Sequence, residues 1–365
     1  MTPHERYQAF MRFQTVDRPP LQEWGPWDST TRAWMGETGK DRDYVLRYLT
    51  ECDPSELTGI NFGMVPPFPE VVIEENADSI TKQDPMGKIH RQFKKDPGAS
   101  MPEFIGSPVR KPGDWDTVRQ RLIPDVQRRY PTEWNELVAR WKREKPILNQ
   151  YSSPANYYGG PSLYGFVRML VGEEEVLYLF YDNLALVNDM METATEFFIR
   201  ILGKSLREAP LTLVQFWEDM CYRNGPLISP AMVAEFMVPR YKRITATIRG
   251  AGHDIIMLDC DGDVKELIPL WLDSGINGVF PMEQAAGNDV HVYRKEYGRS
   301  LLMTGGIDKR VLTQDARAID EELEKKIALA FEGGYVPHVD HGIPPDVSFH
   351  NFMYYWKRKK KLLGV

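Results

Sequence analysis

From residue 146 onward, short apolar segments alternate with amphipathic helical segments, and this alternation limits the possible folds more than any other feature of the chain. Six segments have the composition of buried strands: 146–151, 211–216, 254–258, 278–280, 301–303 and 335–336. The last four begin 24, 23 and 34 residues apart, close to the length of a strand–helix–strand unit. This repeat predicts a parallel sheet covered by helices, either a (β/α)8 barrel or a doubly wound sheet.

Helix signals lie between these strands. Ser229 and Pro230 form an N-cap followed by a proline at the first helical position, and Gly250 stands where that helix should end. Segments 263–273 and 315–332 each begin with an aspartate, which the helix dipole favours. No G-x-G-x-x-G segment follows a predicted strand, so a doubly wound dinucleotide-binding sheet loses its main support. We therefore predict an α/β fold, a (β/α)8 TIM barrel.

Residues 1–145 have no clear periodicity and are rich in proline, glycine and tryptophan. Strand-like segments joined by turn residues predict a small antiparallel sheet, at 70–73, 80–82 and 88–93. Residues 115–145 are expected to be helical. We predict a single TIM-barrel domain over residues 1–365, in which an elaborated N-terminal region, 1–145, precedes regular βα units in 146–365.

Composition excludes several classes of protein. The 45 Lys and Arg against 52 Asp and Glu give a net charge of −7, which argues against a nucleic-acid or anionic-membrane binder. The sequence has no apolar segment long enough to span a bilayer and no signal-peptide pattern. The three cysteines, at 52, 221 and 260, form neither a disulfide framework nor a C-x-x-C metal site. We expect a cytoplasmic protein in which nitrogen and oxygen would supply most ligands of any metal.

Polar residues directly follow the predicted strands, where a barrel carries its reactive groups. They are Trp217, Glu218 and Asp219 after 211–216; Asp259 and Asp261 after 254–258; Glu283 after 278–280; Asp308 after 301–303; and His338 and His341 after 335–336. Carboxylates gathered at one mouth need a metal, a basic side chain or bound protons as compensation. Each residue also has an ordinary alternative as a helix cap, a turn residue or an ion-pair partner.

The carboxylate and imidazole side chains after the strands suggest a metal site, and nearby aromatic residues suggest a substrate pocket. Aspartate and histidine are usual zinc ligands, and Asp259 and Asp261 point to the same side of an extended chain. The aromatic residues Tyr151 and Tyr158 lie in a segment rich in glycine and proline, which would either line a substrate pocket or pack over the barrel.

Several motifs resemble the uroporphyrinogen decarboxylase-like superfamily, which includes zinc- and cobalamin-linked methyltransferases. They are T-P-x-E-R followed by D-R-P in residues 2–19, Glu218-Asp219 followed by 225–230, Gly305-Gly306-Ile307-Asp308, and Asp340-His341-Gly342-Ile343-Pro344. The resemblance spans nearly the whole chain and implies a (β/α)8 barrel.

The sequence departs from the superfamily's patterns at two places. Decarboxylases of uroporphyrinogen carry an R-Q-A-G-R loop that grips propionates, whereas residues 21–28 here contain no arginine, which disfavours porphyrinogen decarboxylation. The methyltransferase branch binds zinc through H-x-C-G and G-C-G-I-P segments. Here these become 259–262 and 340–344, so the resemblance implies Asp259, Asp261 and His341 as Zn2+ ligands, with Glu283 as a fourth ligand or an acid.

The resemblance implies a methyltransferase that demethylates an O- or N-methylated small molecule and passes the methyl group to a separate corrinoid-binding protein. The chain has no D-x-H-x-x-G segment, so that partner would carry the corrinoid. Expected catalytic residues are Glu283, Glu218, Asp219 and His338, and expected substrate-binding residues are Tyr151, Tyr158, Trp217 and Asp308. Alternatives are a decarboxylase or lyase acting on a small carboxylic acid, and a non-catalytic ligand-binding barrel. An oligomer is compatible with the sequence.

Overall fold

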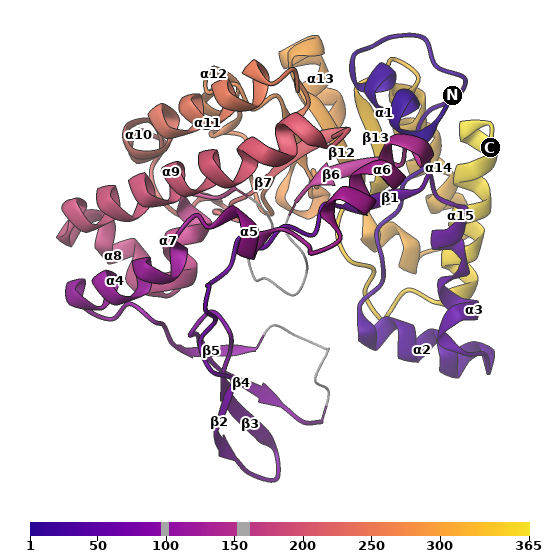
Figure 1. Ribbon diagram of the computed structural model, residues 1–365. Coiled ribbons are helices and arrows are strands. Elements are labelled where there is room, and N and C mark those ends of the chain that lie inside the picture. Colours follow the sequence, from indigo (N-terminus) through magenta and orange to yellow (C-terminus); the bar gives the residue numbers. More distant parts are fainter. Residues whose placement is uncertain (96–101, 152–160) are drawn as a thin grey trace.

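A computed structural model describes residues 1–95, 102–151 and 161–365. The protein has an α/β fold around a curled parallel sheet of seven strands (Figure 1). In order across the sheet, they are β1 (Ser55–Leu57), β6 (Ile147–Gln150), β7 (Leu213–Trp217), β10 (Ile256–Asp259), β11 (Gly278–Phe280), β12 (Leu302–Ile307) and β13 (Tyr335–Val339). Because every neighbouring pair in this sheet is parallel, all strands end at the same edge, and the residues that follow them lie together.

The N-terminal segment 20–26 lies between the first and the last strand of this sheet. Leu21 accepts a hydrogen bond from the backbone N–H of Asp53, just before β1, at 2.8 Å. On the other side, the Glu23 carboxylate accepts from the backbone N–H of Val339 at 3.0 Å, and Pro26 forms a parallel bridge with Ile343. The segment therefore connects the two edges of the curled sheet.

All six predicted strands are confirmed, but two are longer than expected. β12 continues through Gly305 and Gly306 to Ile307, and β13 continues to Val339, so His338 lies within a strand rather than after one. Asp259 and Trp217 are likewise the last residues of their strands. The two-residue alternation of a strand therefore decides which of these side chains face the interior.

Helices cover the outside of the sheet (Figure 1). They are α1 (Pro3–Met11), α2 (Asp28–Thr38), α3 (Arg42–Leu46), α4 (Pro112–Val118), α5 (Val126–Arg129), α6 (Trp134–Glu144), α7 (Tyr164–Val171), α8 (Glu175–Asp182), α9 (Leu184–Glu208), α10 (Pro230–Met232), α11 (Val238–Gly250), α12 (Ile268–Asp273), α13 (Val290–Tyr297), α14 (Ala316–Ala330) and α15 (Phe349–Leu363). No described helix is long and apolar enough to cross a membrane.

The predicted helix after Ser229 is confirmed, because the Ser229 hydroxyl caps it and it ends at Gly250, with a π-helical turn at Val233–Met237. The prediction for 315–332 is confirmed by α14, whereas that for 263–273 shortens to α12. The prediction that residues 115–145 are helical is confirmed in part. The stretch contains the end of α4, a 3-10 turn, α5 and α6 rather than one continuous helix, because Pro124 and Pro131 interrupt it.

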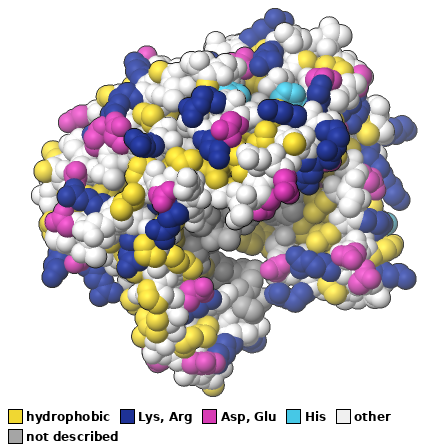
Figure 2. Space-filling view, viewed as in Figure 1, with side chains coloured by type: hydrophobic (Ala, Val, Ile, Leu, Met, Phe, Trp, Pro, Cys, Tyr) yellow, Lys and Arg dark blue, Asp and Glu magenta, His cyan; other side chains and the backbone are white. Residues whose placement is uncertain are grey.

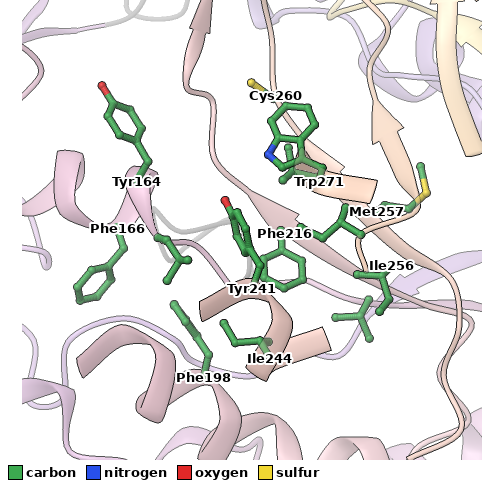
Figure 3. Packing of buried hydrophobic residues seen from close by; sticks show 14 of the residues in the cluster. Tyr164, Phe166, Phe198, Phe216, Tyr241, Ile244, Ile256, Met257, Cys260 and Trp271 are labelled. Atoms are coloured by element: carbon green, nitrogen blue, oxygen red, sulfur yellow. The ribbon is translucent and has the colours of Figure 1, made fainter. Parts of the chain in front are cut away.

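The main core lies between the sheet and the helices that cover it (Figure 3). Tyr241 of α11 stacks edge-on against Phe216 of β7, with ring centroids 5.6 Å apart. Cys260, which follows β10, belongs to this core and is buried.

The predicted small antiparallel sheet is confirmed, and it has four strands. β2 (Val71–Glu75), β3 (Ser79–Gln83), β4 (Ile89–Phe93) and β5 (Glu103–Gly106) pair in chain order. This antiparallel sheet projects from the body of the molecule (Figure 1), and a two-stranded hairpin, β8 (Cys221–Tyr222) and β9 (Gly225–Pro226), follows β7.

Candidate active site

Asp259 is the last residue of β10, at the carboxyl edge of the parallel sheet. The Tyr151 hydroxyl donates to its Oδ2 at 2.9 Å, and the Gln215 side chain is a second hydrogen-bond partner. Gln215 is held in turn by the Asn149 amide, which donates to its Oε1 at 2.7 Å. Burial, followed by the charge of Asp261, raises the pKa of Asp259 well above its usual range.

Asp261 and His341 form a second pair beside Asp259. The Nε2 atom of His341 lies 3.4 Å from Oδ2 of Asp261, and the other carboxylate oxygen, Oδ1, is buried with no hydrogen-bond partner among the described residues. The imidazole lies between two indoles, with ring centroids 5.2 Å from Trp24 and 5.6 Å from Trp27. Trp24 also stacks on Phe280 at 4.8 Å, so a row of four rings fixes the orientation of His341.

Asp219 lies on the opposite side of the mouth, in an ion pair with Arg168. The Arg168 guanidinium donates to its Oδ2 at 2.9 Å and to its backbone oxygen at 2.7 Å. The same guanidinium lies over the ring of Trp217, 5.2 Å from the centroid, and 3.3 Å from a carboxylate oxygen of Glu173. The positive charge of Arg168 is thus already balanced by two carboxylates.

Glu283 faces the same space from the segment after β11. Its Oε2 accepts from the backbone N–H of Gly262 at 3.1 Å, and Lys309 lies 3.6 Å from its Oε1. Asp261, Glu283 and Asp219 line a common cavity of about 420 Å3. The sequence prediction that these strand ends share one mouth is therefore supported by the geometry of these side chains.

Glu218 does not face this mouth. Its carboxylate is fully buried and accepts from Tyr241 Oη at 2.6 Å, Leu163 N–H at 2.7 Å and Gly165 N–H at 2.9 Å. Burial raises the pKa of Glu218 to about 7. The side chain anchors the start of α7 to β7 and α11, apart from the residues at the mouth, and its predicted catalytic role stays a prediction.

His338 and Asp308 also differ from their predicted roles. His338 is buried in β13, where its Nδ1 lies 2.7 Å from the Val339 carbonyl oxygen, and burial lowers its pKa to about 4. The ring therefore stays neutral and lines an inner cavity of about 220 Å3, and its predicted catalytic role stays a prediction. The Asp308 carboxylate accepts from the backbone and side chain of Arg310, which is a capping role rather than substrate binding.

The remaining substrate-binding candidates have different outcomes. Tyr151 and Trp217 both lie at the site, through the contacts with Asp259 and Arg168 given above. Tyr158 lies outside the described residues.

The predicted metal ligands do not converge in this structure. Asp261 and His341 meet, but Asp259 is engaged by Tyr151, and no group of three or more His, Cys, Asp or Glu side chains suited to a metal occurs among the described residues. The donor set consequently does not fit a zinc site with three protein ligands.

Sequence reasoning missed several residues of the site: Asn149, Gln215, Trp24, Trp27 and Arg168. Asn149 and Gln215 could have been found, because each is a polar residue inside an apolar strand, two positions before Tyr151 and Trp217, and therefore on the same face as these. The two tryptophans gave no local signal, since they meet His341 across more than 300 residues of chain.

Comparisons with known proteins agree with this architecture. The family profile of uroporphyrinogen decarboxylase (URO-D) matches residues 165–362. A solved methyltransferase from Methanosarcina mazei is similar with a TM-score of 0.61 and 16% sequence identity, covering 99% of both chains; at this identity the likeness concerns the fold.

A B12-independent methionine synthase from Shewanella sp. W3-18-1, in complex with selenomethionine, has a TM-score of 0.37 and 12% identity over 84% of this chain and 78% of its own, too low to support an argument. No curated protein sequence matches the chain significantly. Because the family profile matches more than half of its residues, the chain belongs to the uroporphyrinogen decarboxylase (URO-D) family.

Proposed function

We propose that the protein is a methyltransferase that demethylates an O- or N-methylated small molecule and passes the methyl group to a separate corrinoid protein. The observation that carries this proposal is the hydrogen bond from Tyr151 to the carboxyl group of Asp259 at the end of β10, together with the burial that raises the pKa of that carboxyl group well above its usual range. Membership of the URO-D family and the fold likeness to a methyltransferase support it.

Asp259 would supply the proton that such a reaction requires. When a methyl group leaves, the oxygen or nitrogen keeps the electron pair of the broken bond and becomes basic. A carboxyl group with a raised pKa donates a proton to that atom as the bond breaks. The hydrogen bonds from Tyr151 and Gln215 then stabilise the carboxylate that remains.

The charges around Asp259 favour this reaction over decarboxylation of a small acid. The carboxylates of Asp261, Asp219 and Glu283 line the cavity at the mouth, and their charges would repel a substrate carboxylate placed there. Arg168 and Lys309, which reach the mouth, are each already opposed by carboxylates. An uncharged methyl-bearing group meets no such repulsion.

The corrinoid, when bound, supplies the nucleophilic acceptor of the methyl group. The cavities at the mouth, of about 420 and 460 Å3, suit a small molecule, so the corrinoid would meet the donor at the opening of the mouth while held by its partner protein. We further propose that segment 20–26 takes the place of an eighth strand, which would close the sheet into a (β/α)8 barrel over one domain of 1–365.

A zinc ion remains a prediction from the sequence alone. Asp261 and His341 would be its first two ligands, yet no third protein ligand joins them among the described residues. We therefore assign no step to a metal.

The test is incubation of the purified protein with methylated donors and reduced cobalamin, followed by chromatography of the demethylated product. We expect product only when reduced cobalamin is present. Release of carbon dioxide from a small acid without cobalamin would favour the decarboxylase alternative and contradict the proposal.

A further inference from the structure

We propose that the cavity between the antiparallel sheet and the mouth is the specificity pocket for the methyl donor, and that it takes a flat apolar body ending in an anionic group. This inference rests on the proposed function and adds a substrate class to it. We call this cavity the appendage pocket; it is lined by residues of β3, β4, α7 and the end of β7, together with Phe104 of β5.

The appendage pocket adjoins the reacting position. Trp217 and Asp219 form part of its wall, and Trp217 is the register partner of Asp259 in the neighbouring strand. The pocket has a volume of about 460 Å3, which suits a drug-sized molecule. Figure 2 shows hydrophobic side chains gathered on the visible face of the projecting antiparallel sheet.

The apolar part of the wall would hold a flat ring. Phe104, Met169 and Trp217 line it, and one face of Trp217 is already covered by the Arg168 guanidinium. Aromatic and thioether side chains pack favourably against a ring. These contacts favour an aromatic or similarly flat body over a flexible chain.

The far wall carries the groups that would bind an anion. Lys82, His90 and Phe104 form one row across β3, β4 and β5, since they are direct register partners. Lys82 forms no ion pair with another described residue. His90 is buried beside Lys82, and its Nδ1, which has no hydrogen-bond partner in the described part of the chain, lies 3.7 Å from Oδ2 of Asp84 rather than facing a ligand.

The arrangement of charge would orient the donor. The mouth around Asp259 is acidic, and Arg168 on the near wall is balanced by Asp219 and Glu173. Lys82, on the wall formed by the antiparallel sheet, therefore offers a cation that no carboxylate among the described residues balances. An anionic group bound there leaves the methyl end of the molecule toward Asp259, and this orientation is the one that the proposed reaction needs.

The test compares two donors that differ only in charge, 4-methoxybenzoate and 4-methoxybenzamide, by isothermal titration calorimetry without corrinoid. For the unmodified protein we expect the carboxylate to bind about tenfold more tightly than the amide, as befits one charge-assisted hydrogen bond. Lys82→Gln should reduce the two affinities to near parity. The matched control, Lys94→Gln, changes an exposed lysine just after β4 and should leave the preference intact.

Three results would overturn the proposed role of the appendage pocket. They are equal affinities of the two compounds for the unmodified protein, no binding of either compound, and the same effect from Lys82→Gln and Lys94→Gln. Failure of the proposed function is separable from these results. A charge preference without cobalamin-dependent demethylation would uphold the pocket and contradict the methyltransferase. Cobalamin-dependent demethylation of both compounds, bound with equal affinity, would support the methyltransferase and contradict the proposed role of the pocket.

Discussion

Replacing Asp261 by asparagine separates the proton-donor account of the site from the zinc interpretation. The substitution keeps the shape of the side chain but removes a negative charge beside Asp259. In the proton-donor account, Asp259 retains its proton partly because ionising it would place two carboxylates together. Asp261→Asn should therefore leave the enzyme active while lowering the pKa of Asp259.

The size of this shift follows from the spacing of the two residues. Two positions along an extended chain are about 7 Å apart. At an effective dielectric constant of about 20, two unit charges at that distance repel each other by about 2 kcal/mol. Since one pKa unit corresponds to about 1.4 kcal/mol, the pKa of Asp259 should fall by about one to two units in Asp261→Asn.

The assay is the pH dependence of the demethylation rate at saturating reduced cobalamin. A group that must carry its proton is active below its pKa, so the rate should be high at low pH and fall as the pH rises through the pKa of Asp259. In Asp261→Asn, this decline should begin about one to two pH units lower. Glu283→Gln is a matched control, because its carboxylate belongs to the same cavity but is not among the groups that raise the pKa of Asp259 most strongly.

An unshifted decline in Asp261→Asn would refute the charge coupling between the two carboxylates. Complete loss of activity at every pH, together with loss of bound zinc, would instead support Asp261 as a metal ligand.

Three further predictions concern the fold and the ring stack. Burial raises the pKa of Glu218 from 4.5 to about 7, so its contribution to stability is fully present below about pH 4.5 and is lost as the pH rises through 7. Denaturation of the unmodified protein at a series of pH values should show a loss of about 3 kcal/mol in the free energy of unfolding over this range. Glu218→Gln should not show this loss. Gly305→Ala should destabilise the protein by more than about 3 kcal/mol in thermal melts, because φ at Gly305 is +95° and a Cβ there would lie 1.8 Å from the backbone oxygen of Pro281. The control Gly36→Ala changes an open helical position and should stabilise the protein slightly in the same measurement. Trp27→Leu removes one ring from His341 and should lower the demethylation rate about two- to tenfold, with unchanged kinetics arguing against a positioning role.

The strands and the location of the mouth could be predicted from the sequence, because both depend on local patterns. Apolar runs marked six strands, and the parallel arrangement implied that the residues after them share one edge. β1 was missed because Ser55-Glu56-Leu57 has no apolar run and is stabilised by its pairing with β6.

The roles of individual side chains depended on contacts that local patterns do not carry. Trp217 and Glu218 are adjacent in sequence, yet the alternation of the strand turns one toward the mouth and the other toward Tyr241. The extension of β13 placed His338 inside the sheet. The sequence of segment 21–28 shows that it lacks arginine, but it does not show that Trp24 and Trp27 pack against His341, because only the fold brings these residues together.

The central claim, that Asp259 protonates the leaving heteroatom, is tested most directly by varying the leaving group in Asp259→Asn. The asparagine keeps the side-chain volume but cannot donate the proton, so demethylation of methoxybenzene derivatives with strongly basic leaving oxygens should fall about 10²- to 10⁴-fold. A donor whose leaving oxygen is weakly basic, such as a nitro-substituted methoxybenzene, needs little protonation and should lose far less rate. An equal loss for both donors, or no loss for either, would contradict the assignment of Asp259 as the proton donor.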